Sequence, residues 1–372
     1  MTKVLIIGSK GFIGKNLILF LKERKDIEII CFNREHHISS LFKIVQKVDF
    51  IFHLAGINRS DNIDDFYKGN TEFTKTLCEA IRDVKCKAPI VYASSIQADQ
   101  NSPYGSSKRG AEEILFALNK DFQIPIHIFR LTNVFGKWCK PNYNSVVATF
   151  CHNIAREIPV NIDDANSIIE LIYIDDVIKK FINLMDSLAE KIISNNFKNI
   201  EPSYKITVGE LAKQIYLFKK ISTSKMLPKV GSGLTRALYS TYISYLPTKN
   251  FSYPISQNKD SRGSFIEILK TPNCGQFSYF TALPGVTRGG HYHNSKTEKF
   301  LVVKGKACFK FFDMNTKTKY ELNVNSNNPE IVETVPGWSH SIKNIGEEEL
   351  IVMIWANEIF DSANPDTFSY QI

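Results

Sequence analysis

The sequence predicts a doubly wound, parallel α/β sheet in its N-terminal part and an antiparallel all-β barrel in its C-terminal part. From residue 3 to about 135, apolar strand-like runs alternate with helical segments, a pattern typical of parallel sheets. A glycine-rich turn follows the first of these runs directly. After about residue 250 the pattern changes to short strands that are separated by Gly, Pro and Asn turns.

Composition limits the classes of protein that fit. The 372 residues correspond to two or three domains at about 150 residues per domain. The net charge of +8 is spread along the chain, which favours anionic ligands such as nucleotides and disfavours nucleic acid as a partner. The apolar run at 4–7 follows Met1 too closely for a signal peptide, and no run is long enough to span a membrane, so we expect a cytoplasmic protein. The spacing of the seven cysteines suggests neither disulfides nor a Cys-rich zinc site.

The N-terminal elements follow from local pattern. Amphipathic segments such as Asn16–Lys25 and Asn70–Val84 read as helices between the strands. The expected strands are 3–7, 27–32, 48–54, 89–94 and 126–130. This order of elements is that of a Rossmann-type nucleotide-binding fold.

The glycine turn predicts a dinucleotide site. Its residues run from Gly8 to Gly14 between the first strand and the first helix, where a pyrophosphate can approach the helix N-terminus. At the end of the second strand, Asn33-Arg34 replaces the acid that NAD-preferring sites usually carry. Arg34, helped by Lys10, therefore favours the 2′-phosphate of NADPH, although Arg34 is also open to reading as a solvated surface charge. The expected contacts in this turn are Gly8, Lys10, Gly11, Phe12, Ile13 and Gly14.

A pair of residues with acid–base potential lies downstream. Tyr104 and Lys108 are one helical turn apart, so both side chains share a helix face. A neighbouring ammonium is expected to lower the pKa of the phenol, which allows proton exchange with a carbonyl near neutrality. Ser94 and Ser95, at the end of the preceding strand, can place a hydroxyl on the same carbonyl oxygen.

Together with His53-Leu54-Ala55-Gly56 and Arg130-Leu-Thr-Asn133-Val-Phe-Gly136, these motifs resemble the nucleotide-sugar branch of the extended short-chain dehydrogenase/reductase family over about residues 1–240. The resemblance implies a catalytic triad of Ser95, Tyr104 and Lys108, with Lys108 also contacting the cofactor beside Leu54 and Ala55. It further implies that the nucleotide sugar contacts Asn133, Lys137, Lys140, Asn142 and Asn144, although a plain surface loop is the alternative. The segment Tyr173–Val177 also resembles a family motif, and we expect a structural role there.

The C-terminal part is expected to begin after a linker at Tyr239–Pro254, which gives predicted domains of 1–245 and 252–372. The expected strands of this part are 265–269, 277–282, 299–303, 307–312 and 350–355.

Four potential metal ligands gather in this part. His291 and His293 alternate on one strand face, Glu298 is expected on a hairpin partner, and His340 lies on a later strand. Three imidazoles and one carboxylate suit Zn²⁺ and also other transition metals, so the identity of the metal stays open.

The segment from Gly285 to Gly305 resembles the first motif of the cupin family, and Gly337-x2-His340-x3-Asn344 resembles the second, with Pro336-Gly337 in place of the usual Pro-x-Gly. The resemblance implies a cupin barrel. Two further segments, Asp260–Glu267 and Arg288–His291, resemble cupin-fold epimerases of 4-keto-6-deoxy nucleotide sugars, which use a histidine base and no metal. His291 is therefore a candidate for both roles. We favour metal binding, which leaves Lys299 or a metal-bound hydroxide as the base.

The order of the two modules resembles the CapF-type family of bifunctional capsular-polysaccharide enzymes over essentially the whole chain. The resemblance implies a UDP-4-keto-6-deoxy-N-acetylhexosamine substrate, C3 epimerisation by the cupin, and C4 reduction with NADPH to a UDP-2-acetamido-2,6-dideoxy-L-talose product. A homodimer is the family-based expectation. Two alternatives stay open: a reductase whose cupin is only structural, and a cupin that acts as a metal-dependent regulatory or assembly module.

Overall fold

The computed structural model describes residues 1–187, 197–251, 253–293, 296–314, 316–363 and 365–372. The described residues form two compact units. The first contains Met1–Ile215 and Ala237–Leu246, and the second contains Tyr216–Arg236 and Pro247–Ile372. Backbone hydrogen bonds from Lys270 to Lys225 and from Leu227 to Lys270 tie the segment 216–236 to the second unit.

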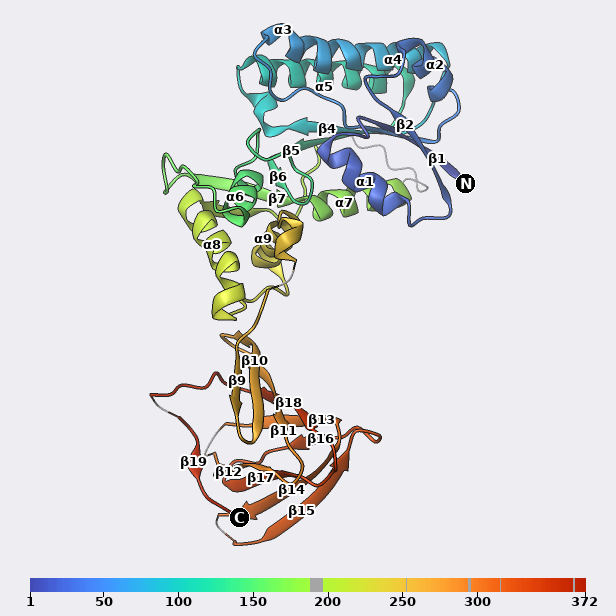
Figure 1. The fold of residues 1–372 in the computed structure, drawn as a ribbon. Coiled ribbons are helices and arrows are strands. Elements are labelled where there is room, and N and C mark those ends of the chain that lie inside the picture. Colours follow the sequence, from blue (N-terminus) through green and yellow to red (C-terminus); the bar gives the residue numbers. More distant parts are fainter. Residues whose placement is uncertain (188–196, 252, 294–295, 315, 364) are drawn as a thin grey trace. The chain divides into compact units, whose positions relative to one another are not determined.

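The first unit is built on a parallel sheet with the strand order β2-β1-β3-β4-β5 (Figure 1). Its strands are β1 (Thr2–Ile7), β2 (Ile27–Phe32), β3 (Phe50–His53), β4 (Ile90–Ser95) and β5 (Ile126–Leu131). The strand order reverses at β1, which lies between β2 and β3, and ligands of such sheets bind at this switch point. The predicted strands and the doubly wound sheet are confirmed.

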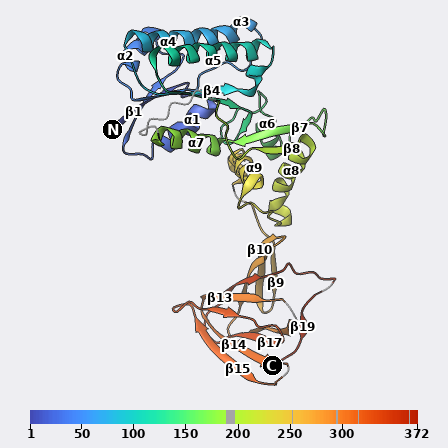
Figure 2. The same ribbon diagram turned by 180° about the vertical axis from the view of Figure 1, so that it is seen from behind.

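Helices cover both faces of this sheet. In Figures 1 and 2, α2, α4 and α5 lie on one face, and α1 and α7 lie on the other. Their bounds are α1 (Phe12–Leu21), α2 (Ile38–Val45), α4 (Phe73–Asp83), α5 (Pro103–Phe122) and α7 (Ile174–Ser187). Because both faces are covered, the strands are apolar along their length, and Leu5, Ile51 and Ile90 are fully buried.

Shorter elements complete the first unit. A small sheet has the order β6-β7-β8, formed by Asn133–Phe135, Ile168–Tyr173 and Tyr204–Thr207. Among the described residues, the other helices are α3 (Ile63–Phe66), a π-helix (Tyr67–Glu72), α6 (Val146–Ala155) and a 3₁₀ turn at Ile96–Asp99 in the first unit. Both α8 (Val208–Ser224) and α9 (Gly233–Ser244) are divided between the units, and a 3₁₀ turn at Thr248–Asn250 belongs to the second. The linker expected at 239–254 therefore begins too early, because residues 239–244 are the last turns of α9.

The second unit contains two sheets, in the arrangement of a cupin-type barrel. One sheet has the order β16-β13-β18-β11-β10-β9 and the other has the order β15-β14-β17-β12-β19. Phe280, Phe300, Phe309 and Val352 belong to the core between them. The strands are β9 (Gln257–Asp260), β10 (Gly263–Thr271), β11 (Gly275–Ala282), β12 (Thr287–Tyr292), β13 (Glu298–Lys304), β14 (Lys306–Asp313), β15 (Lys319–Asn325), β16 (Ile331–Glu333), β17 (Trp338–Asn344), β18 (Leu350–Ala356) and β19 (Phe368–Ser369).

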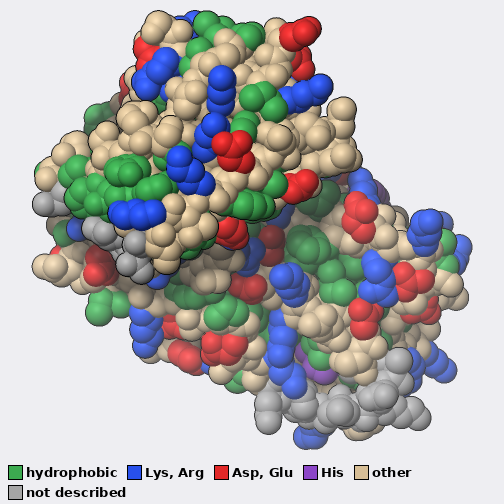
Figure 3. Space-filling view, turned by 90° about the horizontal axis from the view of Figure 1, so that it is seen from below, with side chains coloured by type: hydrophobic (Ala, Val, Ile, Leu, Met, Phe, Trp, Pro, Cys, Tyr) green, Lys and Arg blue, Asp and Glu red, His purple; other side chains and the backbone are tan. Residues whose placement is uncertain are grey.

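The surface fits the spread of charge in the sequence. On the face drawn in Figure 3, Lys and Arg side chains are interspersed with Asp and Glu side chains. Among the described residues, no helix combines the length and the apolar character that a membrane crossing requires.

Candidate functional sites

The glycine turn adopts a shape that only small residues allow. Gly8 has a φ of +84°, and a Cβ at this position would lie 2.7 Å from the Ala55 backbone nitrogen. A Cβ at Gly14 would lie 2.4 Å from the Gly8 carbonyl oxygen, because α1 begins directly against the turn. Gly11 donates a backbone hydrogen bond to Gly8 at 3.0 Å and caps α1. The turn therefore directs the N-terminus of α1, with its free backbone N–H groups, towards a ligand bound beside the end of β1.

A cavity of about 690 Å³ opens at this turn. It is lined by most of the residues that the sequence assigns to the cofactor, namely Gly8, Lys10, Gly11, Arg34, Leu54 and Ala55. Among the described residues, the lining does not include Phe12, Ile13, Gly14 or Lys108. The cavity lies at the switch point of the sheet, where dinucleotides bind in this fold.

Cationic side chains stand at the end of this cavity next to β2. The Asn33 side chain accepts hydrogen bonds from Ser9 Oγ at 2.9 Å and from the Lys10 backbone at 3.1 Å, so it braces the glycine turn. Arg34 is exposed at the cavity wall. Lys10 pairs with Glu35, and this contact lowers the pKa of the Glu35 carboxyl. The sequence analysis missed Glu35, an acid one position after Arg34.

The predicted triad comes together on α5 and β4. The Tyr104 phenol hydrogen-bonds with Ser95. Lys108 is buried, donates from Nζ to the Ala93 carbonyl at 2.9 Å, and lies 4.8 Å from the centre of the Tyr92 ring. Nearby, Asn70 of the π-helix bonds both Ile57 and Ser107, which ties this segment to α5.

The electrostatics of the triad differ from the sequence-based expectation. Burial raises the pKa of the Tyr104 phenol, and the hydrogen bond with Ser95 lowers it only in part. The expected lowering of the Tyr104 pKa is therefore wrong, because burial outweighs the groups that favour the phenolate. Burial also lowers the pKa of Lys108 to about 8, against the charge of Glu112, which raises it.

The two serines of β4 have different surroundings. Ser94 Oγ donates to the buried Glu112 carboxylate at 2.5 Å, so its hydroxyl is held beneath the triad. Ser95 Oγ accepts from the Gln97 backbone at 3.2 Å and also meets Tyr104. This arrangement favours Ser95 over Ser94 as the hydroxyl that faces a substrate.

Of the predicted sugar-binding residues, Asn133 begins β6, and Lys137, Lys140, Asn142 and Asn144 lie on the segment that follows β6. Asn133 donates to the Glu170 carbonyl at 3.0 Å. Lys137 Nζ pairs with Asp175 at 2.8 Å, and Lys140 Nζ lies 4.8 Å from the Tyr143 ring centre. Asn142 and Asn144 are exposed.

This loop is held by residues from three other parts of the chain. Asn16 of α1 donates to the Lys137 carbonyl, the Tyr245 hydroxyl donates to the Cys139 carbonyl, and Arg59 donates to the Tyr143 carbonyl. Trp138 and Asn142 both have positive φ values, 69° and 53°, which non-glycine residues seldom adopt. Sequence spacing gave no signal for Arg59 or Tyr245, because both are distant from the loop along the chain.

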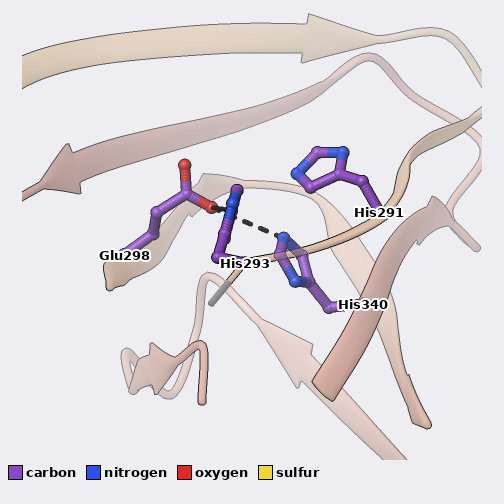
Figure 4. Close-up of side chains that lie close together, drawn as sticks. All are labelled: His291, His293, Glu298 and His340. Carbon is purple, nitrogen blue, oxygen red and sulfur yellow. Dashed lines mark hydrogen bonds and ion pairs between the residues drawn. The ribbon is translucent and has the colours of Figure 1, made fainter. Parts of the chain in front are cut away.

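In the second unit the four predicted ligands converge, as Figure 4 shows. Their ligand atoms all lie within 4.8 Å of one another, and His293, Glu298 and His340 are buried. Glu298 Oε2 is 3.2 Å from His293 Nε2 and 3.4 Å from His340 Nε2. His291 and His340 are direct neighbours across the pair β12–β17.

The route by which Glu298 reaches the cluster differs from the expectation. It was predicted on a hairpin partner of the histidine strand, and that prediction is wrong, because β12 pairs with β17 and β19. Glu298 begins β13, which belongs to the opposite sheet. The cluster therefore spans the space between the sheets. Gly337, with a φ of +79°, donates to the His293 carbonyl at 2.7 Å, so the Pro336-Gly337 turn still brings β17 to the cluster.

The donor set fits a transition metal. His293 Nδ1 hydrogen-bonds with the Asp366 carbonyl at 2.5 Å, which leaves the Nε2 lone pair for the cluster. Both ring nitrogens of His340 are buried without a hydrogen-bond partner, although Nε2 lies near Glu298. Unsatisfied imidazole nitrogens beside a carboxylate are the groups that Zn²⁺ takes.

Electrostatics favour a neutral histidine beside an ionised carboxylate. Burial, with the charges of His340 and His293, lowers the pKa of His291 to about 4. Burial raises the pKa of the Glu298 carboxyl, but the hydrogen bond with His293, the close approach of His340 and the charge of Lys296 outweigh it and hold the pKa well below its usual range. Metal binding needs both of these protonation states.

A cavity of about 520 Å³ adjoins the cluster. Its walls include His291, Glu298 and His340 together with Arg288 and Lys296. Lys296 is 8% exposed, and its Nζ lies 3.2 Å from Glu298 Oε1. Among the described residues, the cavity walls do not include Lys299, whose ammonium pairs with Glu333 on the surface. Lys299 is therefore a poor candidate for a base, and Lys296 was missed by the sequence analysis.

Comparison with known proteins assigns a family to each part of the chain. The profile of the NAD dependent epimerase/dehydratase family matches residues 4–197, and that of the polysaccharide biosynthesis C-terminal domain matches residues 258–368. A protein of Pseudomonas aeruginosa, a UDP-2-acetamido-2,6-beta-L-arabino-hexul-4-ose reductase, is 53% identical over 100% of this chain and 99% of its own length.

Solved structures match either the whole chain or part of it. The capsular polysaccharide assembling protein CapF from Staphylococcus aureus is 38% identical, with a TM-score of 0.91 over 99% of this chain and 100% of that one. UDP-glucuronic acid 4-epimerase from Bacillus cereus, at 19% identity, shares the fold over 66% of this chain and 98% of its own, with a TM-score of 0.56. The chain belongs to the NAD dependent epimerase/dehydratase family, carries a polysaccharide biosynthesis C-terminal domain in addition, and matches CapF over its whole length.

Proposed function

We propose that this protein is a bifunctional nucleotide-sugar enzyme of polysaccharide biosynthesis. Its cupin part, expected over 252–372, epimerises C3 of a UDP-2-acetamido-2,6-dideoxy-4-hexulose. Its reductase part, expected over 1–245, then reduces the C4 ketone with NADPH, and the product is UDP-2-acetamido-2,6-dideoxy-L-talose, a precursor of UDP-N-acetyl-L-fucosamine. The observation that carries the proposal is the full-length match to a hexul-4-ose reductase, combined with two chemically distinct sites on one chain.

The reduction uses the groups on α5 and β4. When bound, the nicotinamide supplies the hydride for C4, and the ketone oxygen then needs a proton. Tyr104 is the donor that fits, because its phenol is held by Ser95 and its high pKa keeps it protonated. Ser95 orients the carbonyl oxygen, and Lys108 supplies positive charge beside it.

NADPH is proposed as the cofactor on the charges around the β2 end of the cavity. Arg34 and Lys10 line that end, and the Asn33 side chain, which is used to brace the turn, replaces an acid that would repel a 2′-phosphate. Glu35 opposes this preference through its contact with Lys10.

The epimerisation requires removal of the proton at C3, next to the ketone, and return of a proton to the opposite face of that carbon. His291, His293, Glu298 and His340 would hold a Zn²⁺ ion, which supplies Lewis-acid polarisation of the ketone. Around it, Arg288 places a guanidinium in the cavity wall, where it can bind an anionic part of the substrate. We further propose a homodimer that works in the cytoplasm, where nucleotide sugars and NADPH are made.

The proposal is tested by NMR in D2O without NADPH, with the UDP-4-keto-6-deoxy sugar as substrate. We expect wild type to incorporate deuterium at C3 and Glu298→Gln to lose this exchange by at least about 100-fold. The matched control is Glu333→Gln, which removes an exposed carboxylate beside β13. Exchange in Glu298→Gln at the wild-type rate would contradict a role for the cluster. Absence of exchange in wild type would leave a reductase with a structural cupin.

A further inference from the structure

A charged network that the reaction as described does not use lies directly beneath the triad. Glu112 of α5 is 2% exposed, and its carboxylate accepts from Arg130 Nε at 3.0 Å and from Arg130 Nη2 at 2.7 Å. Arg130 of β5 also donates to Asp99 at 2.5 Å and lies 3.7 Å from the Phe197 ring centre. The two hydrogen bonds from Arg130 form a bidentate ion pair, which fixes the orientation of the Glu112 carboxylate.

The position of Glu112 links this pair to the triad. Tyr104, Lys108 and Glu112 follow one another at four-residue spacing and so share one face of α5. Each holds one of three consecutive residues at the end of β4. Lys108 bonds the Ala93 carbonyl, Glu112 bonds Ser94 Oγ, and Tyr104 bonds Ser95.

Stability alone does not account for an ion pair in this place. Replacing a buried ion pair by well-packed apolar residues is often neutral or stabilising, so helix packing does not require one. The carboxylate does two things that an apolar residue cannot do. It fixes the Ser94 hydroxyl, and it places a negative charge near Lys108, whose own burial disfavours the ammonium form.

We propose that Glu112, anchored by Arg130, is a positioning residue of the reductase site, which fixes the end of β4 that presents Ser95 to Tyr104. Its carboxylate lies on the same face of α5 as Lys108, about one helical turn away. The proposal rests on the proposed reductase function. Among the described residues, the titratable groups that interact with Lys108 are His53 of β3, Tyr92 of β4 and Glu112 of α5. Tyr104 precedes Lys108 by about one turn of α5.

The test is Glu112→Gln, which keeps the shape of the side chain and removes its charge. The reaction is followed as NADPH oxidation with the UDP-4-keto-6-deoxy sugar, over a range of pH. We expect kcat to fall on the order of tenfold with little change in the KM for NADPH. Because Glu112 favours the ammonium, its removal should move the alkaline limb of the kcat profile to lower pH by roughly one unit.

The matched control is Glu113→Gln, the same change at the exposed neighbouring position of α5. It should leave the profile unchanged. A Glu112→Gln protein that loses thermal stability but keeps the wild-type kcat and alkaline limb would overturn the proposal, because its role would then be structural only.

Ser94→Ala keeps the inference testable if Glu112→Gln does not fold. This change removes the hydrogen bond between Ser94 and Glu112 and leaves the negative charge of Glu112 in place. We therefore expect kcat to fall several-fold, while the alkaline limb of the kcat profile stays at the wild-type pH. Wild-type kcat in Ser94→Ala would remove the positioning role. Tyr104→Phe separates this outcome from failure of the proposed function, since a Tyr104→Phe protein that reduces the ketone normally would refute the reductase site itself.

Discussion

His127 of β5 shows how one buried side chain can set the acid stability of the first unit. It is 1% exposed, and neither ring nitrogen has a hydrogen-bond partner among the described residues. Burial, with the nearby charge of Lys198, lowers the pKa of His127 to about 4. The folded protein therefore keeps this imidazole neutral, whereas the unfolded chain takes up a proton near pH 6.5.

We predict that this difference destabilises the first unit as the pH falls from about 6.5 towards 4. The unfolded state binds the additional proton in that window, and the stability is complete only above it. At pH 5 the loss is on the order of 2 kcal/mol. His127→Leu should remove most of it. Urea unfolding of both proteins at pH 7 and pH 5 measures the effect, and equal losses in the two would assign the acid sensitivity to other groups.

Single residues could be proposed from the sequence where their spacing along the chain is characteristic. Tyr104 and Lys108 were found from their helical spacing, and His291, His293 and His340 from a strand pattern with a suitable donor set. Glu112 was missed because a glutamate on an amphipathic helix normally faces water. Its burial depends on Arg130, which lies on another element and gives no local sign.

Among the elements, the start of α1 is the one most constrained by backbone approach. Gly14 faces the Gly8 carbonyl and Ser9 so closely that an added Cβ would have to displace backbone atoms on both sides. This crowding fixes where the N-terminus of α1 lies relative to the cavity.

Gly14→Ala should therefore impair both stability and cofactor binding. We expect a loss of roughly 2 kcal/mol in unfolding free energy and at least about tenfold weaker NADPH binding, because the helix N-terminus must move away from the turn. Thermal unfolding and fluorescence titration with NADPH provide the two readouts. Gly231→Ala, at a site with no atom within 4 Å of the added Cβ, is the control that should change neither. Unchanged NADPH affinity in Gly14→Ala would contradict the binding site.

The helices and strands were predicted well where the apolar residues follow one clear pattern. The parallel strands are continuous apolar runs, and their limits in the structure agree closely with the sequence pattern. The pairing of β12 was predicted wrongly, because a hairpin was assumed for strands that follow each other closely. Chain proximity says nothing about which of two facing sheets a strand will join, and β13 joins the other one.

Across the whole molecule, the two sites should be separable by mutation. Tyr104→Phe should lower ketone reduction at least about 100-fold, since it removes the proton donor, while deuterium exchange at C3 continues at the wild-type rate. Glu298→Gln should lose deuterium exchange at C3 and bind NADPH with the wild-type affinity. NMR and fluorescence titration of both variants test this separation. Loss of C3 exchange in Tyr104→Phe would mean that the two reactions share groups.

The cluster that joins the two sheets of the second unit also constrains the order of events during synthesis. Three of its members leave the ribosome close together, on β12, just after it, and at the start of β13, but His340 follows only with β17. Until then His291 lacks its cross-strand neighbour. A nascent chain therefore cannot assemble the complete cluster before β17 has been translated, and an ion held there would be acquired only after that point.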